Sequence, residues 1–135
     1  MKHSAADRLD ILELLALADN AATRRDVGAY MACFTDDAVL DGGMGEHRGK
    51  AAMEGAVGPI WRAEGDTSVH LTTNAVVEPD SEAENRAVAR SVLVILANDP
   101  VTVHSISNIT HHLVKESAGW RVARRTVQPL LGTSA

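Results

Sequence analysis

Aromatic side chains are scarce in this sequence. They make up 3% of the 135 residues, as two Trp, one Tyr and one Phe. Hydrophobic residues still reach 45% and charged residues 23%, which is typical of a globular chain with a mainly aliphatic and alanine core. The formal net charge is −5, so the chain has neither the basic surface nor the stacking residues of a nucleic-acid-binding protein. We therefore expect no nucleic-acid partner.

Cysteine and long apolar runs are also lacking. Cys33 is the only cysteine, which excludes an internal disulfide, and its apolar context predicts a buried thiol. No apolar run approaches the roughly 20 residues that cross a bilayer, so we expect no membrane partner. Residues 1–8 are too polar for a signal peptide, and the expected compartment is the cytoplasm.

The order of predicted elements is helical first and extended later. A capping box at Ser4 and Asp7 precedes a long amphipathic helix that closes at Arg24 and Arg25. Asp26 should cap a second helix that continues to Phe34 and is ended by residues 35–37. Further predictions are a strand at 38–41, a helix at 50–61, and strands at 69–78, 86–97, 101–115 and 120–128. This pattern predicts an α+β fold and one domain over residues 1–135.

Motifs for cofactors and metals are missing from the chain. It contains no GxGxxG, no phosphate-binding loop and no GxSxG. His111 and His112 are consecutive on a predicted strand, so they point to opposite faces and are poorly placed to bind one metal. We predict neither a cofactor nor a metal.

Three short stretches carry a family resemblance. FTDDAVLDG, VHLTTNAVVE and GWRVARR, in this order, resemble the SnoaL-like group of the nuclear-transport-factor-two superfamily, with scytalone dehydratase and hexachlorocyclohexane dehydrochlorinase-like proteins nearest in pattern. The resemblance covers about residues 5–128. It implies a cone-shaped, cystatin-like α+β barrel, in which a curved mixed or antiparallel sheet wraps a long N-terminal helix around an apolar cavity. It also implies a homo-oligomer, a dimer or trimer.

The resemblance assigns the chemistry to a strand histidine and an aspartate of the first helix. The histidine corresponds to His70, within VHLTTN. The acid's position is occupied by Thr23, in the tetrapeptide TRRD. Thr23 can orient an imidazole but supplies no charge, and Asp19, one helical turn earlier, is the replacement acid to test. His70, Asp19 and Thr23 are therefore the predicted catalytic residues.

The resemblance also predicts a substrate-binding wall. Alternate residues of the strand before the last hairpin should face the cavity, and Arg125 corresponds to a pocket arginine of dehydrochlorinase-like members. Arg125 is suited either to an anionic substrate group or to a surface ion pair. The predicted substrate-binding residues are Leu40, Ser105, Ser107, Ile109, His111 and Arg125.

Three functions remain open at this point. The first is a cofactor-independent lyase, isomerase or polyketide-cyclase-type enzyme, in which His70 moves a proton on a largely apolar small molecule. The second is a non-catalytic binding or oligomeric protein that has lost the acid of the His–Asp dyad. The third, weaker, is an epoxide hydrolase. A carboxylate at hydrogen-bond distance from His70 in a shared pocket would favour the first over the second.

Overall fold

The computed structural model describes residues 2–42, 45–65 and 67–132, and its first element is the predicted long helix. Helix α1 (Ala5–Arg24) begins at Ser4, whose Oγ accepts a hydrogen bond of 3.1 Å from Asp7 N. The helix ends where Arg25 adopts a left-handed conformation with φ of 60°. One face of α1 is buried, at Ile11, Leu14, Leu15, Ala18, Ala21 and Ala22.

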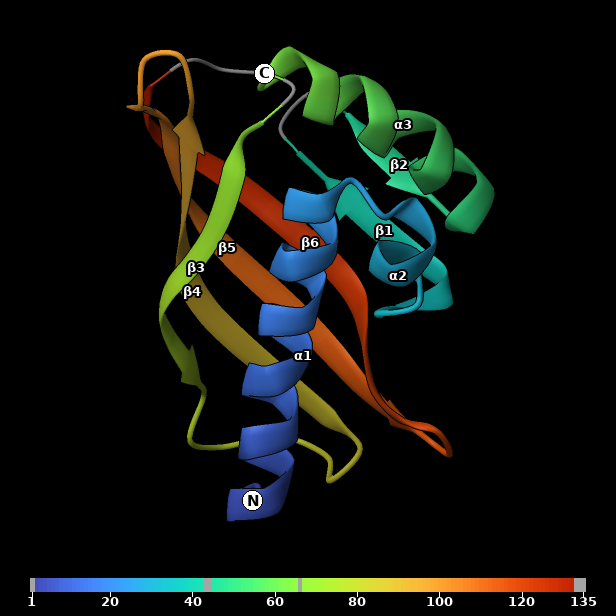
Figure 1. Ribbon diagram of the computed structural model, residues 1–135. Helices are drawn as coiled ribbons and strands as arrows, with labels where there is room; N and C mark the ends of the chain where they lie inside the picture. The colour runs from blue at the N-terminus through green and yellow to red at the C-terminus, as the bar shows by residue number, and fades with distance from the viewer. Residues whose placement is uncertain (1, 43–44, 66, 133–135) are drawn as a thin grey trace.

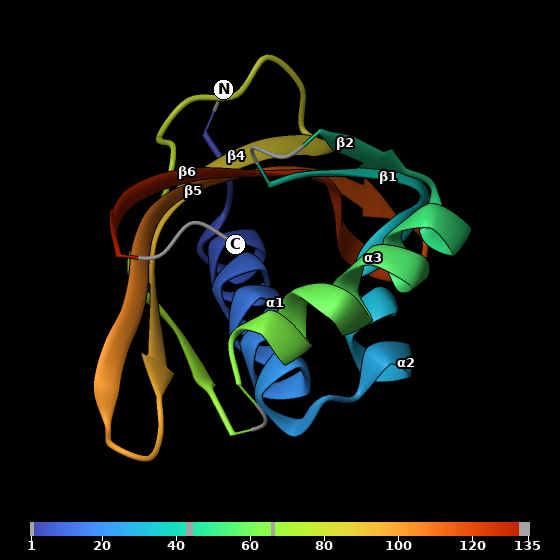
Figure 2. The same cartoon turned by 90° about the horizontal axis from the view of Figure 1, so that it is seen from above.

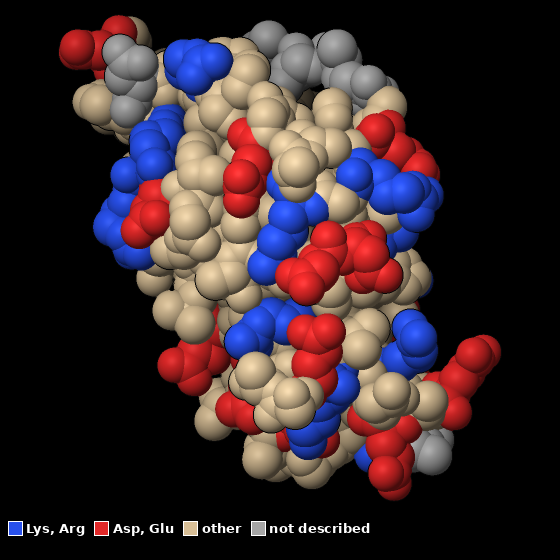
Figure 3. All heavy atoms as spheres, turned by 90° about the vertical axis from the view of Figure 1, so that its right-hand side faces the viewer, with Lys and Arg blue, Asp and Glu red and all other residues tan. Residues whose placement is uncertain are grey.

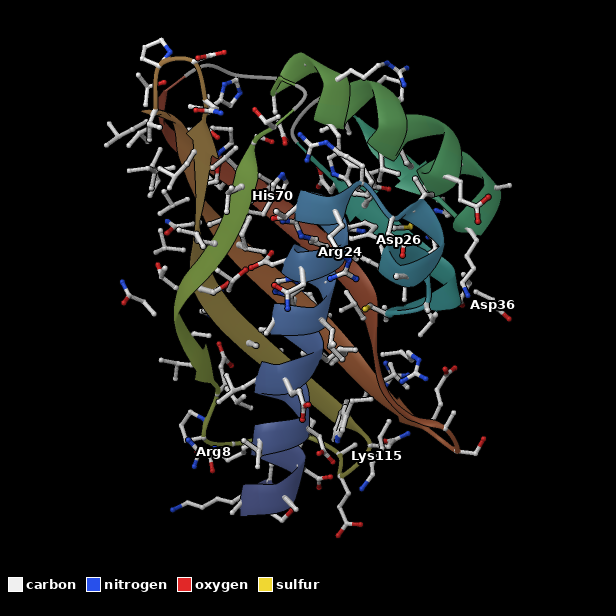
Figure 4. The ribbon with its side chains drawn as sticks, in the orientation of Figure 1. Arg8, Arg24, Asp26, Asp36, His70 and Lys115 are labelled. Carbon is white, nitrogen blue, oxygen red and sulfur yellow. The ribbon has the colours of Figure 1, made fainter. Side chains whose placement is uncertain are left out.

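The second helix is shorter than predicted. Helix α2 (Val27–Met31) is capped by Asp26, whose Oδ1 accepts from Ala29 N at 3.0 Å. The chain is already a strand at Phe34, because β1 (Phe34–Asp41) pairs there with Val122. The prediction that residues 35–37 end a helix is therefore wrong: Asp36 and Asp37 are the exposed positions of β1, and Asp36 points outward in Figure 4.

A short strand and a third helix follow. Strand β2 (Glu46–Arg48) was not predicted, since three polar residues carry no alternating pattern; it pairs antiparallel with the end of β1. Helix α3 (Lys50–Ala63) matches the predicted third helix and extends two residues further. Its buried residues are Met53, Val57 and Trp61, which recur every four residues and form one apolar stripe despite Pro59.

The last four strands complete one curved sheet. They are β3 (Val69–Val77), β4 (Arg86–Ala97), β5 (Thr102–Glu116) and β6 (Gly119–Gly132), and the order across the sheet is β2-β1-β6-β5-β4-β3. All neighbours are antiparallel except β1 and β6, which are parallel. The predicted α+β fold with a curved mixed sheet around the N-terminal helix is confirmed, and the sheet is not closed into a full barrel.

The sheet bends around α1 and leaves the helices on its concave side. In Figure 1, α1 stands in front of the sheet with β3 at one edge. Figure 2, seen from above, shows β4, β5 and β6 curving behind α1, with α2 and α3 beside it below β1. A main apolar cluster fills the concavity between α1 and the sheet, and a smaller one of Leu93, Ile95 and Ile109 lies on β4 and β5.

Charges of both signs are interspersed over the face that carries α2, α3, β1 and β2 (Figure 3). In the described ranges, none of the helices combines the length and the hydrophobicity needed to cross a membrane.

Candidate active site

A cavity of about 410 Å³ opens on the concave side of the sheet. This volume lies in the range of small-molecule sites. Its wall is mostly apolar, with a few polar side chains among them. It includes residues from α1, α2, α3 and all the long strands, such as Leu15, Tyr30, Leu40, Val57, Trp61, Glu64, His70, Leu93, Ser105, His111, Arg125 and Val127.

His70 points inward from the edge strand β3. Its neighbours Val69 and Leu71 are 37% and 42% exposed, whereas His70 is 8% exposed, which is the alternation expected of a strand. The backbone N–H of His70 donates to Thr23 Oγ1 at 3.0 Å, which ties β3 to the end of α1. Figure 4 shows His70 beside the C-terminal half of that helix. The strand and the helix together fix the imidazole at the cavity wall.

The partner of the His70 ring is Glu64. The distance from His70 Nε2 to Glu64 Oε1 is 2.6 Å, and the two side chains are 7% and 4% exposed. Glu64 caps the C-terminal end of α3, six residues before His70 in the chain. Both residues line the same cavity. A buried carboxylate and imidazole at this distance form a charge-assisted pair when the imidazole is protonated.

A short hydrogen-bond chain holds Glu64 in place. Ser68 Oγ donates to Glu64 Oε1 at 3.1 Å, and Arg25 Nη2 donates to Ser68 Oγ at 2.7 Å. The same guanidinium also donates to Gly65 O at 2.6 Å and, through Nη1, to Ala22 O at 2.8 Å. Arg25 therefore clamps the segment after α3 to the end of α1. A buried acid needs such support, because an unsupported carboxylate in an apolar wall is costly.

The two predicted partners of the His70 ring have other contacts. Asp19 Oδ2 accepts from Thr72 N at 2.5 Å, so this carboxylate is engaged by the β3 backbone, although Asp19 also lines the cavity. Thr23 contacts the backbone of His70 and not its ring. The prediction that Asp19 or Thr23 orients the imidazole is corrected here: Glu64 holds the ring, and the other two position the strand that carries it.

Most of the predicted binding wall faces the cavity. Leu40, Ser105, Ser107, His111 and Arg125 all line it. Ile109 is the exception: it points to the same side of β5 but packs with Leu93 and Ile95, and it is 1% exposed. The alternation of inward-facing side chains along β5 is thus as predicted. One of these side chains, Ile109, packs in the hydrophobic core and does not line the cavity.

Three further polar side chains, His111, Arg125 and Tyr30, line the same cavity. His111 and Arg125 are directly opposite on β5 and β6, and the pKa of His111 is lowered to about 3 by burial, with Arg125 and His112 adding to the shift. Tyr30 is 6% exposed and packs against Phe34 and Trp61. Burial raises the pKa of Tyr30, so its phenol stays protonated.

Glu64 was the residue that the sequence did not reveal. It lies in the segment after α3, where an isolated acid between Ala63 and Gly65 looks like a solvated helix end. The available signal was its position six residues before His70, close enough in sequence for a loop to fold back. No group of three or more His, Cys, Asp or Glu able to hold a metal occurs among the residues with described positions.

Comparison with known proteins shows to which family this chain belongs. The profile of the SnoaL-like domain matches residues 3–126. The chain belongs to the SnoaL-like family. That family includes polyketide cyclases and dehydratases. No curated protein matches the chain.

Several solved structures superpose well on this one. A Nostoc punctiforme protein of unknown function with a cystatin-like fold has a TM-score of 0.87 and 22% identity, covering 96% of both chains. A Novosphingobium aromaticivorans NTF2-like protein has a TM-score of 0.83 and 25% identity, over 96% of this chain and 85% of its own. A candidate scytalone dehydratase from the same organism has a TM-score of 0.79 and 16% identity, over 93% and 85%. At these identities the similarity shows a shared fold.

Proposed function

We propose that this SnoaL-like protein is a cofactor-independent enzyme that removes a proton from a largely apolar small molecule, in an elimination, isomerisation or cyclisation. The observation that carries the proposal is the buried pair of His70 and Glu64 in the wall of an apolar cavity, 2.6 Å apart. The dehydratases and polyketide cyclases of the family support the reaction class. The homo-oligomeric state predicted above stays a prediction.

The geometry supports a separate role for each member of the pair. Glu64 holds Nε2, so Nδ1 is the ring nitrogen left to accept a proton from the substrate. The imidazolium that forms is stabilised by the adjacent carboxylate. The apolar wall limits access of water, which would compete for the proton and weaken the attraction between the charges. A later return of the proton to another substrate atom or to solvent would complete an isomerisation or an elimination.

The binding-protein alternative rested on the missing acid of helix α1. Glu64 supplies a carboxylate from a different segment, so the loss of an acid at Thr23 no longer argues against catalysis. An epoxide hydrolase would hold a water between acids and an arginine. Asp19 is engaged by Thr72 N, and Glu64 by His70 and Ser68, which favours proton transfer by His70 over that arrangement.

The experiment uses a carbon acid that reports directly on a positioned base. 5-Nitrobenzisoxazole loses its C3 proton to a base while its N–O bond breaks, and it becomes a coloured cyanophenolate. The wild-type protein should convert it faster than buffer at neutral pH. We expect His70→Ala to lower kcat/KM about a hundredfold, the usual contribution of a positioned base. His112→Ala, which alters an exposed histidine of β5, is the matched control and should leave turnover unchanged.

Two results would count against the proposed function. One is equal turnover by the wild-type protein and His70→Ala. The other is absence of turnover by a wild-type protein that binds the probe, which quenching of Trp61 fluorescence in the cavity wall can show.

A further inference from the structure

The cavity wall formed by β5 and β6 carries a second polar pair. His111 and Arg125 are register partners on these two antiparallel strands, and both side chains line the cavity. His111 is 4% exposed, which makes it a deeply buried imidazole. Directly opposite residues on one face of a sheet have neighbouring side chains. The guanidinium is also close enough to lower the pKa of His111.

Within the described part of the chain, no hydrogen bond to His111 Nδ1 and no ion pair of Arg125 is found. His111 Nδ1 is buried and has no hydrogen-bond partner among the described residues. No ion pair or hydrogen bond joins the Arg125 guanidinium to the described part of the chain. Its neighbour Arg124 shows the contrast, since it is paired with Asp41 at 3.2 Å and with Glu46 at 2.6 Å. An arginine kept unpaired in an apolar cavity is available to a ligand.

The chemistry of the pair defines what it can bind. Arg125 offers a permanent positive charge with fixed N–H donors. His111 remains a neutral imidazole at physiological pH because it is buried beside that charge. An N–H on its Nδ1 would be buried without an acceptor, so the tautomer protonated at Nε2 is favoured. Both residues then donate and neither accepts, which selects an oxygen atom with negative charge.

We propose that His111 and Arg125 bind one ligand oxygen that is anionic or becomes so during the reaction, such as the oxygen of a ketone or a phenol on a largely apolar ligand. This inference rests on the proposed function. Removal of a proton next to a ketone by His70 moves the electron pair of the C–H bond onto the carbonyl oxygen as an enolate. The two donors stabilise that oxygen where the charge develops.

The binding test uses 2-naphthol, whose absorption band moves to longer wavelength when its hydroxyl ionises. The absorption band is followed as the pH is raised, with and without protein, so that the pH at which the bound compound ionises is compared with that of the free compound. We expect the wild-type protein to bind the naphtholate about tenfold or more tightly than the naphthol, so the bound compound should ionise at a pH lower by about one unit or more than the free compound. Arg125→Met should abolish this preference, and His111→Phe should weaken it about tenfold.

Controls separate the oxygen site from the rest of the cavity. Naphthalene, which lacks the oxygen, should bind the wild-type protein and both variants equally, which also shows that the variants are folded. Arg124→Met and His112→Phe change the neighbouring residues and should keep the preference for the naphtholate. His111→Gln, which retains an N–H donor, should lose less affinity than His111→Phe.

The outcomes distinguish this site from the His70–Glu64 dyad. His70→Ala should retain the preference for the naphtholate although it loses turnover of 5-nitrobenzisoxazole. If only the proposed role of His70 and Glu64 in proton transfer is wrong, the preference for the naphtholate should still be observed. Bound 2-naphthol that ionises at the same pH as the free compound in the wild-type protein overturns the inference. So does a preference that is unchanged in Arg125→Met or lost in His70→Ala.

Discussion

Acid should destabilise this protein through His111, beginning above the pH range in which carboxylates titrate. The pKa of His111 is about 3 in the folded protein against an ordinary value of 6.5, because burial disfavours the charged imidazole. The unfolded chain therefore binds a proton at this residue below pH 6.5, and the folded protein does not until about pH 3. Stability falls as the pH falls through this window, because the unfolded state holds more protons there.

The size of the effect follows from the width of the window. Each unit between the two pKa values corresponds to about 1.4 kcal/mol, so the free energy of unfolding should drop by about 3 kcal/mol between pH 7 and pH 4. Urea unfolding at several pH values in this range measures the slope. His111→Gln removes the titrating group, so its free energy of unfolding should drop by about 3 kcal/mol less than that of the wild-type protein over the same pH range. His112→Gln, which changes the exposed neighbour and removes only the smallest cause of the His111 shift, should keep most of the wild-type slope.

The reasoning would be refuted by parallel pH profiles of the wild-type protein and His111→Gln. Such a result would mean that the folded protein protonates this imidazole at the same pH as the unfolded chain, with a partner or water that offsets its burial. The same result would remove the ground for treating His111 as neutral in the proposed oxygen site, where an imidazolium would donate from both ring nitrogens.

Two further predictions concern the supports of the fold. Arg25→Met breaks the hydrogen bonds to Gly65 and Ser68, so it should lower the free energy of unfolding by about 1–3 kcal/mol in urea titrations. It should also lower the turnover of 5-nitrobenzisoxazole, because Glu64 is then held less firmly. Turnover equal to that of the wild-type protein would contradict the role of Arg25 in holding Glu64. Hydrogen bonds from Lys115 and then Trp120 lower the pKa of Asp7 below 3.8, so its contribution to stability is present above that pH and lost as the pH falls through the lowered value. Asp7→Asn should therefore lower the free energy of unfolding by about 1 kcal/mol at neutral pH and by less in strong acid. An equal loss at both pH values would contradict the predicted pH dependence.

Much of the fold could be predicted because its local signals agree with its long-range pairing. The capped α1 and the strands β3 to β6 each combine a clear period with turn residues at both ends. Strand β1 was misassigned at its beginning because its two halves differ: Asp36 and Asp37 interrupt the apolar run, and only pairing with β6 shows that Phe34 belongs to the strand. Secondary-structure propensities do not include long-range contacts, and the contact with β6 determines where β1 begins.

The candidate site was predictable in part for a similar reason. His70, His111 and Arg125 lie on strands, where alternation predicts which side chains face inward, and all three line the cavity. The acid was not predictable, because Glu64 follows the end of α3 and reaches His70 only through the tertiary placement of that helix. A neighbouring acid on α1 was the better choice by helical spacing, but Asp19 is engaged by the backbone of β3.

The central claim is that His70 and Glu64 act as one unit, and a double-mutant cycle on the elimination of 5-nitrobenzisoxazole tests it most directly. The cycle compares kcat/KM of the wild-type protein, His70→Ala, Glu64→Gln and the double variant. If Glu64 acts only through the imidazole, its removal costs nothing further once His70 is gone, and the double variant should equal His70→Ala. Losses that multiply in the double variant would show two independent contributions and contradict the dyad.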